Sequence, residues 1–319
     1  MTNYITNTKG LIGSPLIRKQ EILTKQAHKL GILPLSIYYY PVETDSDGEL
    51  SSRLDGILSG LSFGDNVILQ LPTMLGERYE QELIQKINVF RQVSNTHLIL
   101  AVHNVIRDKD KATKMIDKYY NQADVLILPS IHYGNYLQSL GLTVRQLVYL
   151  HTYDEGNDLV FNDLPNNSRR IYLLSENKLI YEKVQEENLM AISYDKNELS
   201  LLEKQYEMHH QGGIGIIWPQ NDSQEFDQKM SPSPEFNQFC LSGIPIIVKE
   251  GSALSQLVYN YNLGMVGNDL MKTLAMVKEL KDNEYYEMLR NVNRVAKILG
   301  KGLFTSRVLI ESLNRAQIM

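Results

Sequence analysis

The chain has 319 residues and a formal net charge of −5, with 37 acidic against 32 basic side chains. At about 100–200 residues per domain, this length predicts two domains. The acidic excess disfavours a nucleic acid as the main partner. The single cysteine, Cys240, excludes an internal disulfide and a thiolate metal cage. Because the sequence has neither a signal peptide pattern nor an apolar run of about 18 residues, we expect a soluble cytoplasmic protein without a membrane span.

In the first half of the chain, short apolar runs alternate with longer amphipathic segments. We expect helices at 17–30 and 77–93, and strands at 4–6, 35–40, 66–70, 97–102 and 124–129. Strands that are apolar on both faces and separated by helices are typical of a parallel sheet covered on both sides.

The segment 151–169 is rich in Asp, Asn, Gly and Pro, which predicts a connection between two domains. The alternation then restarts. We expect strands at 170–174, 189–193, 213–218 and 244–248, and helices at 237–241, 269–280, 282–299 and 304–317. The sequence therefore predicts two α/β domains facing each other across a cleft, with a ligand at the carboxyl ends of the strands.

The loop after the first strand, residues 7–15, contains two glycines and leads into a helix. Its backbone N–H groups could hold an anion or a sugar hydroxyl. It could equally be an ordinary turn, in which Ser14 caps the helix and Pro15 takes the first helical position. The two interpretations can coincide. The loop matches neither the dinucleotide-binding nor the P-loop motif.

Two short motifs contain potential metal ligands, but a structural explanation fits each of them better. Asp45-Ser46-Asp47 resembles the DxD motif of some sugar-transferring enzymes, in which two carboxylates share a divalent cation. The same residues fit a turn followed by a helix N-cap, which we favour. His209 and His210 are adjacent and so do not share a helix face, and we expect a solvated helix end there. We therefore predict no metal site.

His103 and the acidic residues of the connection are the candidate proton acceptors. His103 follows an apolar strand, so we expect it at the carboxyl edge of the sheet, facing the cleft, where a histidine can donate a hydrogen bond or accept a proton. A structural role is an equal alternative. The carboxylates of the connection could also act as a base, although each by itself fits a solvated charge better: Asp154, Glu155, Asp158 and Asp163.

Two serines and two prolines precede the predicted helix at 237–241, in Ser231-Pro232-Ser233-Pro234-Glu235. An exposed helix N-terminus presents unpaired N–H groups that suit phosphates. Glu235 would repel an anion there, however, and each proline removes a donor. The segment is a compromised phosphate site.

An ordered series of short motifs runs nearly from end to end of the chain. It resembles the GT-B-fold glycosyltransferases of Gram-positive bacteria that add a hexose to N-acetylglucosamine on serine-rich-repeat adhesins, a family once described as nucleotide-sugar-synthetase-like. The matching segments are residues 4–7, 44–46, 50–57, 70–73, 123–125, 129–130, 211–215, 218, 242–245, 250–251 and 301–305.

The resemblance implies an N-terminal acceptor domain at 1–155 and a C-terminal nucleotide-sugar domain at 156–319, with a last helix, 303–317, that packs back on the first. It implies a hexosyltransferase that moves a glucose-type sugar from a UDP-sugar to a glycan or glycopeptide, without a cofactor or obligatory metal, and that forms homo-oligomers.

By position in that family, the candidate site residues fall into four groups. The acceptor side would be lined by Asn7, Gly10, Thr73 and His103, and the diphosphate by Ser231, Ser233 and Glu235. Lys249, Glu250 and Gly251 would lie near the sugar of the nucleotide. The base would be His103 or, as second choice, Asp154, and the cation that stabilises the leaving diphosphate would be Lys178 or Lys249.

The chain departs from the family pattern at three places. Members usually carry a lysine where this chain has Glu235, a Gly-Asn-Pro turn and an arginine at 175–178, and an aspartate at Asn104. Losing one charge-assisted phosphate contact costs about 1.5–3 kcal/mol, or roughly ten- to a hundred-fold in affinity. Three functions stay open: an active glycosyltransferase, a catalytically silent GT-B module that binds a glycan or a partner protein, and an unrelated two-domain protein such as an epimerase.

Overall fold

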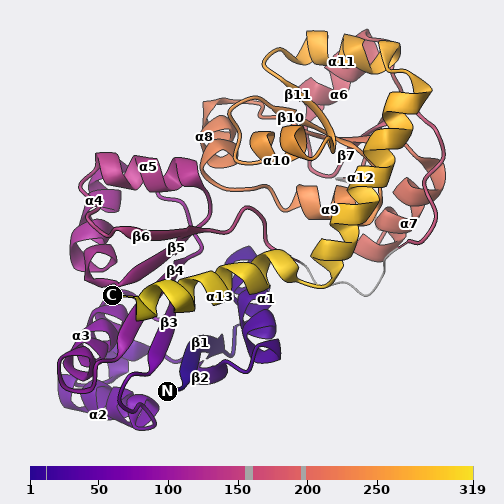
Figure 1. Ribbon diagram of the computed structural model, residues 1–319. Coiled ribbons are helices and arrows are strands. Elements are labelled where there is room, and N and C mark those ends of the chain that lie inside the picture. Colours follow the sequence, from indigo (N-terminus) through magenta and orange to yellow (C-terminus); the bar gives the residue numbers. More distant parts are fainter. Residues whose placement is uncertain (12, 155–160, 195–198, 319) are drawn as a thin grey trace. The chain divides into compact units, whose positions relative to one another are not determined.

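The computed structural model describes residues 1–11, 13–154, 161–194 and 199–318 (Figure 1). The chain divides into two compact units. The first contains Met1–Leu150 and Thr305–Met319, and the second contains His151–Phe304. Within the described residues, no helix is both long enough and apolar enough to cross a membrane.

The first unit is built on a six-stranded parallel sheet with the strand order β2-β1-β3-β4-β5-β6. Because β2 and β3 lie on opposite sides of β1, right-handed crossovers place α1 on one face of the sheet and α3, α4 and α5 on the other. The elements are β1 (Asn3–Lys9), α1 (Pro15–Lys29), β2 (Leu33–Tyr38), η1 (Val42–Thr44), α2 (Asp47–Leu58), β3 (Asn66–Leu71), α3 (Glu77–Ser94), β4 (His97–Val102), α4 (Lys109–Lys118), η2 (Tyr120–Gln122), β5 (Val125–Leu128), α5 (Ile131–Ser139) and β6 (Gln146–Tyr149).

The C-terminal helix α13 (Leu303–Gln317) is held on the first unit by backbone contacts to β6. Arg315 Nη1 donates to the carbonyl of Leu147 at 3.0 Å, and Arg307 donates to that of Tyr149 at 3.4 Å. The chain thus returns to the unit in which it began.

The second unit has a five-stranded parallel sheet with the order β11-β10-β9-β7-β8. Its elements are β7 (Ile171–Leu173), α6 (Lys178–Glu186), β8 (Ala191–Ser193), α7 (Leu201–Gln211), β9 (Ile214–Ile217), α8 (Asp222–Met230), α9 (Glu235–Leu241), β10 (Ile246–Lys249), α10 (Ser255–Asn260), β11 (Gly264–Gly267), α11 (Leu270–Glu279) and α12 (Asp282–Gly300).

Apolar side chains cover both faces of this second sheet, as expected of buried parallel strands. Ile246 and Val248 belong to one core cluster with Phe236 and Phe239 of α9, whereas Ile247 between them belongs to a second cluster with Leu274 of α11. The predicted parallel α/β architecture is confirmed.

The sequence missed several short elements, of which β11 is the clearest. It has four residues with a glycine at each end. A Cβ on Gly264 would lie 2.0 Å from the carbonyl oxygen of Ile246, so the close approach to β10 requires glycine. A short strand with glycine at both ends lacks the run of β-branched and aromatic residues by which a strand is recognised in a sequence.

Candidate functional site

A pocket of about 290 Å³ lies at the carboxyl ends of strands in the second sheet; we call it the strand-end pocket. Ser175 follows β7, Trp218 follows β9, and Asp227 belongs to α8. Ser233 and Glu235 close it from the start of α9. The sequence had named Ser233 and Glu235 but not the other three, for which only their position after or beside a strand end was a signal.

Glu235 dominates the electrostatics of this pocket. Its backbone N–H donates to the hydroxyl of Ser233, which in turn donates to its carboxylate, both at 3.4 Å. Burial raises the pKa of the Glu235 carboxyl, although hydrogen bonds from Ser175 and Ser233 oppose the rise. Asp227 is a second carboxylate in the wall, and no lysine or arginine is among the described lining residues.

The two lysines predicted to stabilise a diphosphate lie outside the pocket lining. Lys178, the first residue of α6, is exposed, with its Nζ 3.8 Å from Glu182. Lys249 ends β10, and its Nζ lies 2.6 Å from a carboxylate oxygen of Glu225 in α8. Any anion drawn to Lys249 must compete with Glu225.

The remaining predicted residues of the second unit lie in turns. Ser231 is the C-cap of α8, and its N–H donates to the backbone carbonyl of Asp227. The N–H of Glu250 donates to the carbonyl of Gly267, and Gly251 adopts a positive φ of 76°. The helix that follows Ser233, α9, has only seven residues, with Glu235 in its first turn. That this segment is a compromised phosphate site stays a prediction.

Thr73 lies at the carboxyl edge of the first sheet but is buried. Its N–H and its hydroxyl both donate to Glu80 Oε1, at 2.7 and 3.2 Å, and its carbonyl accepts from Thr8 at 3.1 Å. Burial raises the pKa of Glu80, although the two bonds from Thr73 oppose the rise. The Thr73 hydroxyl is therefore already hydrogen-bonded to another side chain of the protein.

His103 is also buried, with 1% of its surface exposed, and the expectation that it faces an open cleft is wrong. Its Nε2 lies 2.8 Å from Gln70 Oε1. Burial, with a smaller contribution from Lys19, lowers the pKa of His103 to about 3, so the ring is neutral near pH 7. The strand pattern correctly places His103 after a strand of the first sheet, but it does not show whether other segments cover that position.

The acidic residues of the connection differ in burial. Asp154 is fully buried, so the solvated interpretation is wrong for it. Asp163 is exposed and accepts a hydrogen bond from His209 Nε2 at 3.1 Å. Glu155 and Asp158 lie outside the described residues.

Asn7 and Gly10 line a second pocket of about 540 Å³, which we call the α1 groove. The groove lies beside β1, α1 and the start of β2, and its lining includes two lysines, Lys9 and Lys25, and one carboxylate, Glu21. Ser14 caps α1 with Pro15 in its first turn, as predicted. Thr73 and His103 are not among the described lining residues of this groove, so the groove gathers only two of the four predicted acceptor residues.

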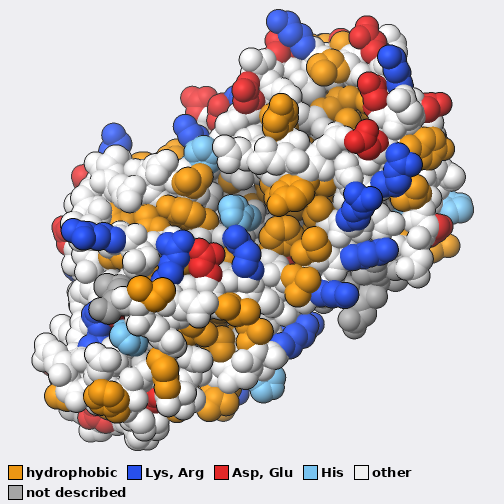
Figure 2. Space-filling view, viewed as in Figure 1, with side chains coloured by type: hydrophobic (Ala, Val, Ile, Leu, Met, Phe, Trp, Pro, Cys, Tyr) orange, Lys and Arg blue, Asp and Glu red, His pale blue; other side chains and the backbone are white. Residues whose placement is uncertain are grey.

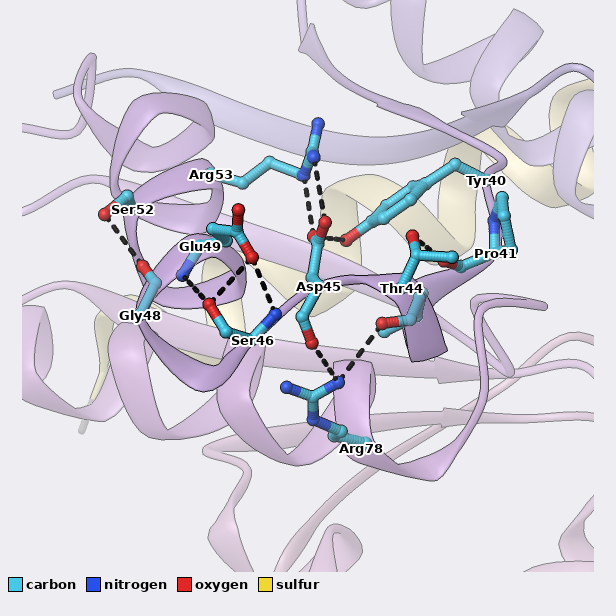
Figure 3. Close-up of polar contacts among 11 residues, drawn as sticks. Tyr40, Pro41, Thr44, Asp45, Ser46, Gly48, Glu49, Ser52, Arg53 and Arg78 are labelled. Atoms are coloured by element: carbon cyan, nitrogen blue, oxygen red, sulfur yellow. Dashed lines mark hydrogen bonds and ion pairs between the residues drawn. The ribbon is translucent and has the colours of Figure 1, made fainter.

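The Asp45-Ser46-Asp47 motif is a structural cap (Figure 3). Asp45 accepts hydrogen bonds from Arg53 Nε at 3.0 Å, from Arg53 Nη2 at 3.1 Å and from the Tyr40 hydroxyl at 2.7 Å. These contacts, the arginine first, lower the pKa of Asp45. Asp47 pairs with Arg78 at 2.8 Å, and Ser46 caps α2 in a capping box with Glu49. Two arginines already neutralise the carboxylates.

The histidine pair behaves differently from the prediction. His209 is 6% exposed, and its ring stacks on Phe161 with 3.7 Å between ring centroids, so it is not solvated. His210 is exposed. Among the described residues, no group of three or more metal-ligating side chains is gathered.

Two units built on parallel sheets, with helices on both faces and a pocket at strand ends of the second, define the GT-B fold. Solved structures share it. HepE of Anabaena in complex with UDP-glucose has a TM-score of 0.58 at 9% identity, covering 98% of this chain and 99% of that one. An α-glucosyltransferase in complex with UDP and DNA has a TM-score of 0.59 at 10% identity, covering 99% of each chain.

Sequence comparison defines the family. Residues 2–152 match the N-terminal domain, and residues 166–312 the C-terminal domain, of the family described as Glucosyltransferase 3-like. Glucosyltransferase 3 of Streptococcus parasanguinis is 32% identical, covering 99% of both chains, and that of Streptococcus gordonii is 29% identical, covering 97% of both. The chain belongs to the Glucosyltransferase 3-like family, as the sequence motifs had indicated.

Proposed function

We propose that this protein is a glycosyltransferase that moves a glucose-type hexose from a UDP-sugar to a glycan or glycopeptide. The observation that carries the proposal is the end-to-end match, at 32% identity, to a protein called Glucosyltransferase 3. One solved protein of the same fold holds UDP-glucose and another holds UDP, which supports a UDP-sugar as the donor.

The donor is assigned to the strand-end pocket. Hydroxyl groups of Ser175 and Ser233 can bond to sugar or phosphate oxygens, and Trp218 offers an apolar wall. The leaving diphosphate needs positive charge, and Lys249 supplies it once its ion pair with Glu225 opens. Lys178, exposed on α6, is the second candidate cation.

The acceptor is assigned to the first unit, where Asn7 and Gly10 line the α1 groove. Two residues are candidates for the base. His103 has a pKa of about 3, which makes it a weak proton acceptor. We therefore give His103 the role of holding Gln70 and keep Asp154 as the other candidate base, which has no exposed surface and would have to become accessible before it could act.

A donor screen tests the proposal directly. The full chain is incubated with an N-acetylglucosaminyl peptide and, separately, with UDP-glucose, UDP-galactose and UDP-N-acetylglucosamine, and the peptide is followed by mass spectrometry. We expect a gain of one hexose with UDP-glucose. Light scattering after gel filtration tests the homo-oligomer that family membership favours.

The alternative is a catalytically silent module that binds a glycan or a partner protein. It is favoured by Glu235 and Asp227, which give the strand-end pocket two carboxylates and, among its described lining residues, no cation. Calorimetry with UDP discriminates the two. If wild type shows no binding heat at millimolar UDP and Glu235→Lys binds UDP, then the negative charge of Glu235 prevents nucleotide binding and makes the module catalytically silent. Glu176→Lys, which adds the same charge at an exposed position, is the matched control.

A further inference from the structure

Helix α12 has two opposite faces. Val292, Val295 and Leu299 pack into one core cluster of the second unit, and Tyr285 and Leu289 pack into the other. At 100° per residue, these side chains share one side of the helix. The opposite side faces away from both cores.

Three cations occupy that opposite side, Arg290, Arg294 and Lys297, and the C-cap residue Lys301 continues the same row. Their spacing of four, three and four residues confines them to about 60° of the helix circumference over roughly 16 Å. All four are exposed. Figure 2, viewed as in Figure 1, shows a row of Lys and Arg side chains along the course of α12. We call these four residues the α12 basic stripe.

The four cations of the stripe outnumber the acids beside them. Within the described part of the chain, no ion pair joins any of its four cations to a carboxylate. Glu287, one turn before Arg290, lies on the same side of the helix and is the acid closest to the stripe along the chain. Four aligned cations beside one acid, in a chain whose net charge is −5, create a local positive potential that an anionic partner can neutralise.

Exposed aromatic and aliphatic side chains flank the stripe. On α12 itself these are Tyr286, 40% exposed, and Ile298, 38% exposed. Asn291 Nδ2 donates to the carbonyl of Asn262 at 3.3 Å, which brings the end of α10 against α12. Tyr261 and Tyr259, 58% and 76% exposed, immediately precede that contact.

We infer that the α12 basic stripe binds the phosphate headgroups of an anionic lipid bilayer. Basic residues on a helix, next to tyrosine and aliphatic side chains, are the combination that sits at a membrane interface. A straight row on an outward helix face also suits an extended surface better than a compact ligand. The headgroups supply the negative charge, and the tyrosines reach the boundary between headgroups and acyl chains. This binding is peripheral and independent of the proposed sugar transfer.

The test is co-sedimentation of the full chain with vesicles. Vesicles of equal parts phosphatidylglycerol and phosphatidylcholine are compared with pure phosphatidylcholine at low and high salt. We expect sedimentation only with the anionic vesicles, weakened by salt. Each cation near an anionic surface contributes about fivefold to partitioning, so Arg294→Gln combined with Lys297→Gln should weaken binding about 25-fold.

The control pair is Lys111→Gln with Lys114→Gln on α4, which makes the same change in net charge at exposed positions of the first unit. It should bind the vesicles like wild type. Circular dichroism verifies that both pairs fold. The inference is overturned if wild type stays in the supernatant, or if the α12 pair and the control pair bind alike. Retention on poly-glutamate beads without vesicle binding would assign the stripe to an acidic polypeptide instead.

Discussion

The carboxylate of Glu80 holds Thr73 twice, by its backbone N–H at 2.7 Å and by its hydroxyl at 3.2 Å. Both residues are buried, and the carbonyl of Thr73 accepts from Thr8. Glu80 on α3 therefore fixes the loop after β3, and Thr73 in that loop contacts the end of β1 at the carboxyl edge of the first sheet.

Replacing Glu80 by alanine leaves both buried donors of Thr73 without this acceptor. We expect a loss of about 3 kcal/mol in the free energy of unfolding, because hydrogen bonds to a charged group contribute about 1.5–3 kcal/mol. Chemical denaturation measures it. Glu43→Ala, at an exposed position, is the control and should change stability little.

Glu80→Gln tests the raised pKa of Glu80. A carboxyl group whose pKa is higher in the folded state contributes stability that is present below the unfolded pKa and is lost as pH rises through the folded pKa. Glutamine removes this loss, so the variant should gain stability relative to wild type as pH rises above about 4.5. A constant difference between variant and wild type across that range would argue against the raised pKa.

Asp45→Asn tests the electrostatics of the α2 cap. Burial and the hydrogen bond to Asp45 raise the pKa of Tyr40 to about 12. Removing the negative charge should bring that pKa back toward 10, which a difference spectrum of tyrosinate formation between variant and wild type detects. Superimposable titrations would contradict the assignment.

Because Arg53 and Arg78 already pair with Asp45 and Asp47, we also expect sugar transfer to tolerate a chelator.

Gly215 and Gly56 form a matched pair of glycine positions. A Cβ on Gly215 would meet the ring of Phe239 at 2.3 Å, whereas one on Gly56 in α2 has nothing within 4 Å. We expect Gly215→Ala to destabilise by about 1–3 kcal/mol through overpacking. Gly56→Ala should stabilise by roughly 0.5–1 kcal/mol, since alanine favours a helix interior. Thermal unfolding compares the two, and equal shifts would refute the tight packing of α9 against β9.

His103→Gln tests which group controls the pH dependence of transfer. With a pKa of about 3, His103 does not titrate between about pH 5 and 8, where an ordinary histidine does. We expect the variant to retain the wild-type shape of kcat/KM against pH, whatever its absolute rate. Disappearance of a limb in that range would restore His103 as the base.

Local patterns were sufficient to predict most strands of the two sheets and the start of the first helix. Ser14 caps α1, as expected. Which polar residues are buried was harder to predict, because burial depends on contacts between segments far apart in the sequence. His209 is enclosed by Phe161 and the carbonyl of Ser242, and no local signal announces either contact.

The strand-end pocket shows the same limit. Ser233 and Glu235 were found through the local pattern of serines and prolines before a helix, whereas Ser175, Trp218 and Asp227 come from three other segments that only the parallel order of β7 and β9 brings together. The order of the strands in a sheet determines which loops lie next to one another, and this order cannot be read from a single sequence.

The central claim is that the strand-end pocket holds a UDP-sugar beside Glu235. The most direct measurement is calorimetric titration of UDP-glucose into wild type and Glu235→Gln at pH 5.5 and pH 8, roughly one unit and more above the ordinary carboxyl pKa. Because burial raises the pKa of Glu235, a larger share of this carboxyl is protonated at the lower pH than at the higher one, and protonation removes a repulsive charge. We expect wild type to bind more tightly at pH 5.5, and Glu235→Gln to bind at both pH values with much less pH dependence. Absence of heat in both proteins, or the same pH dependence in both, would contradict the account.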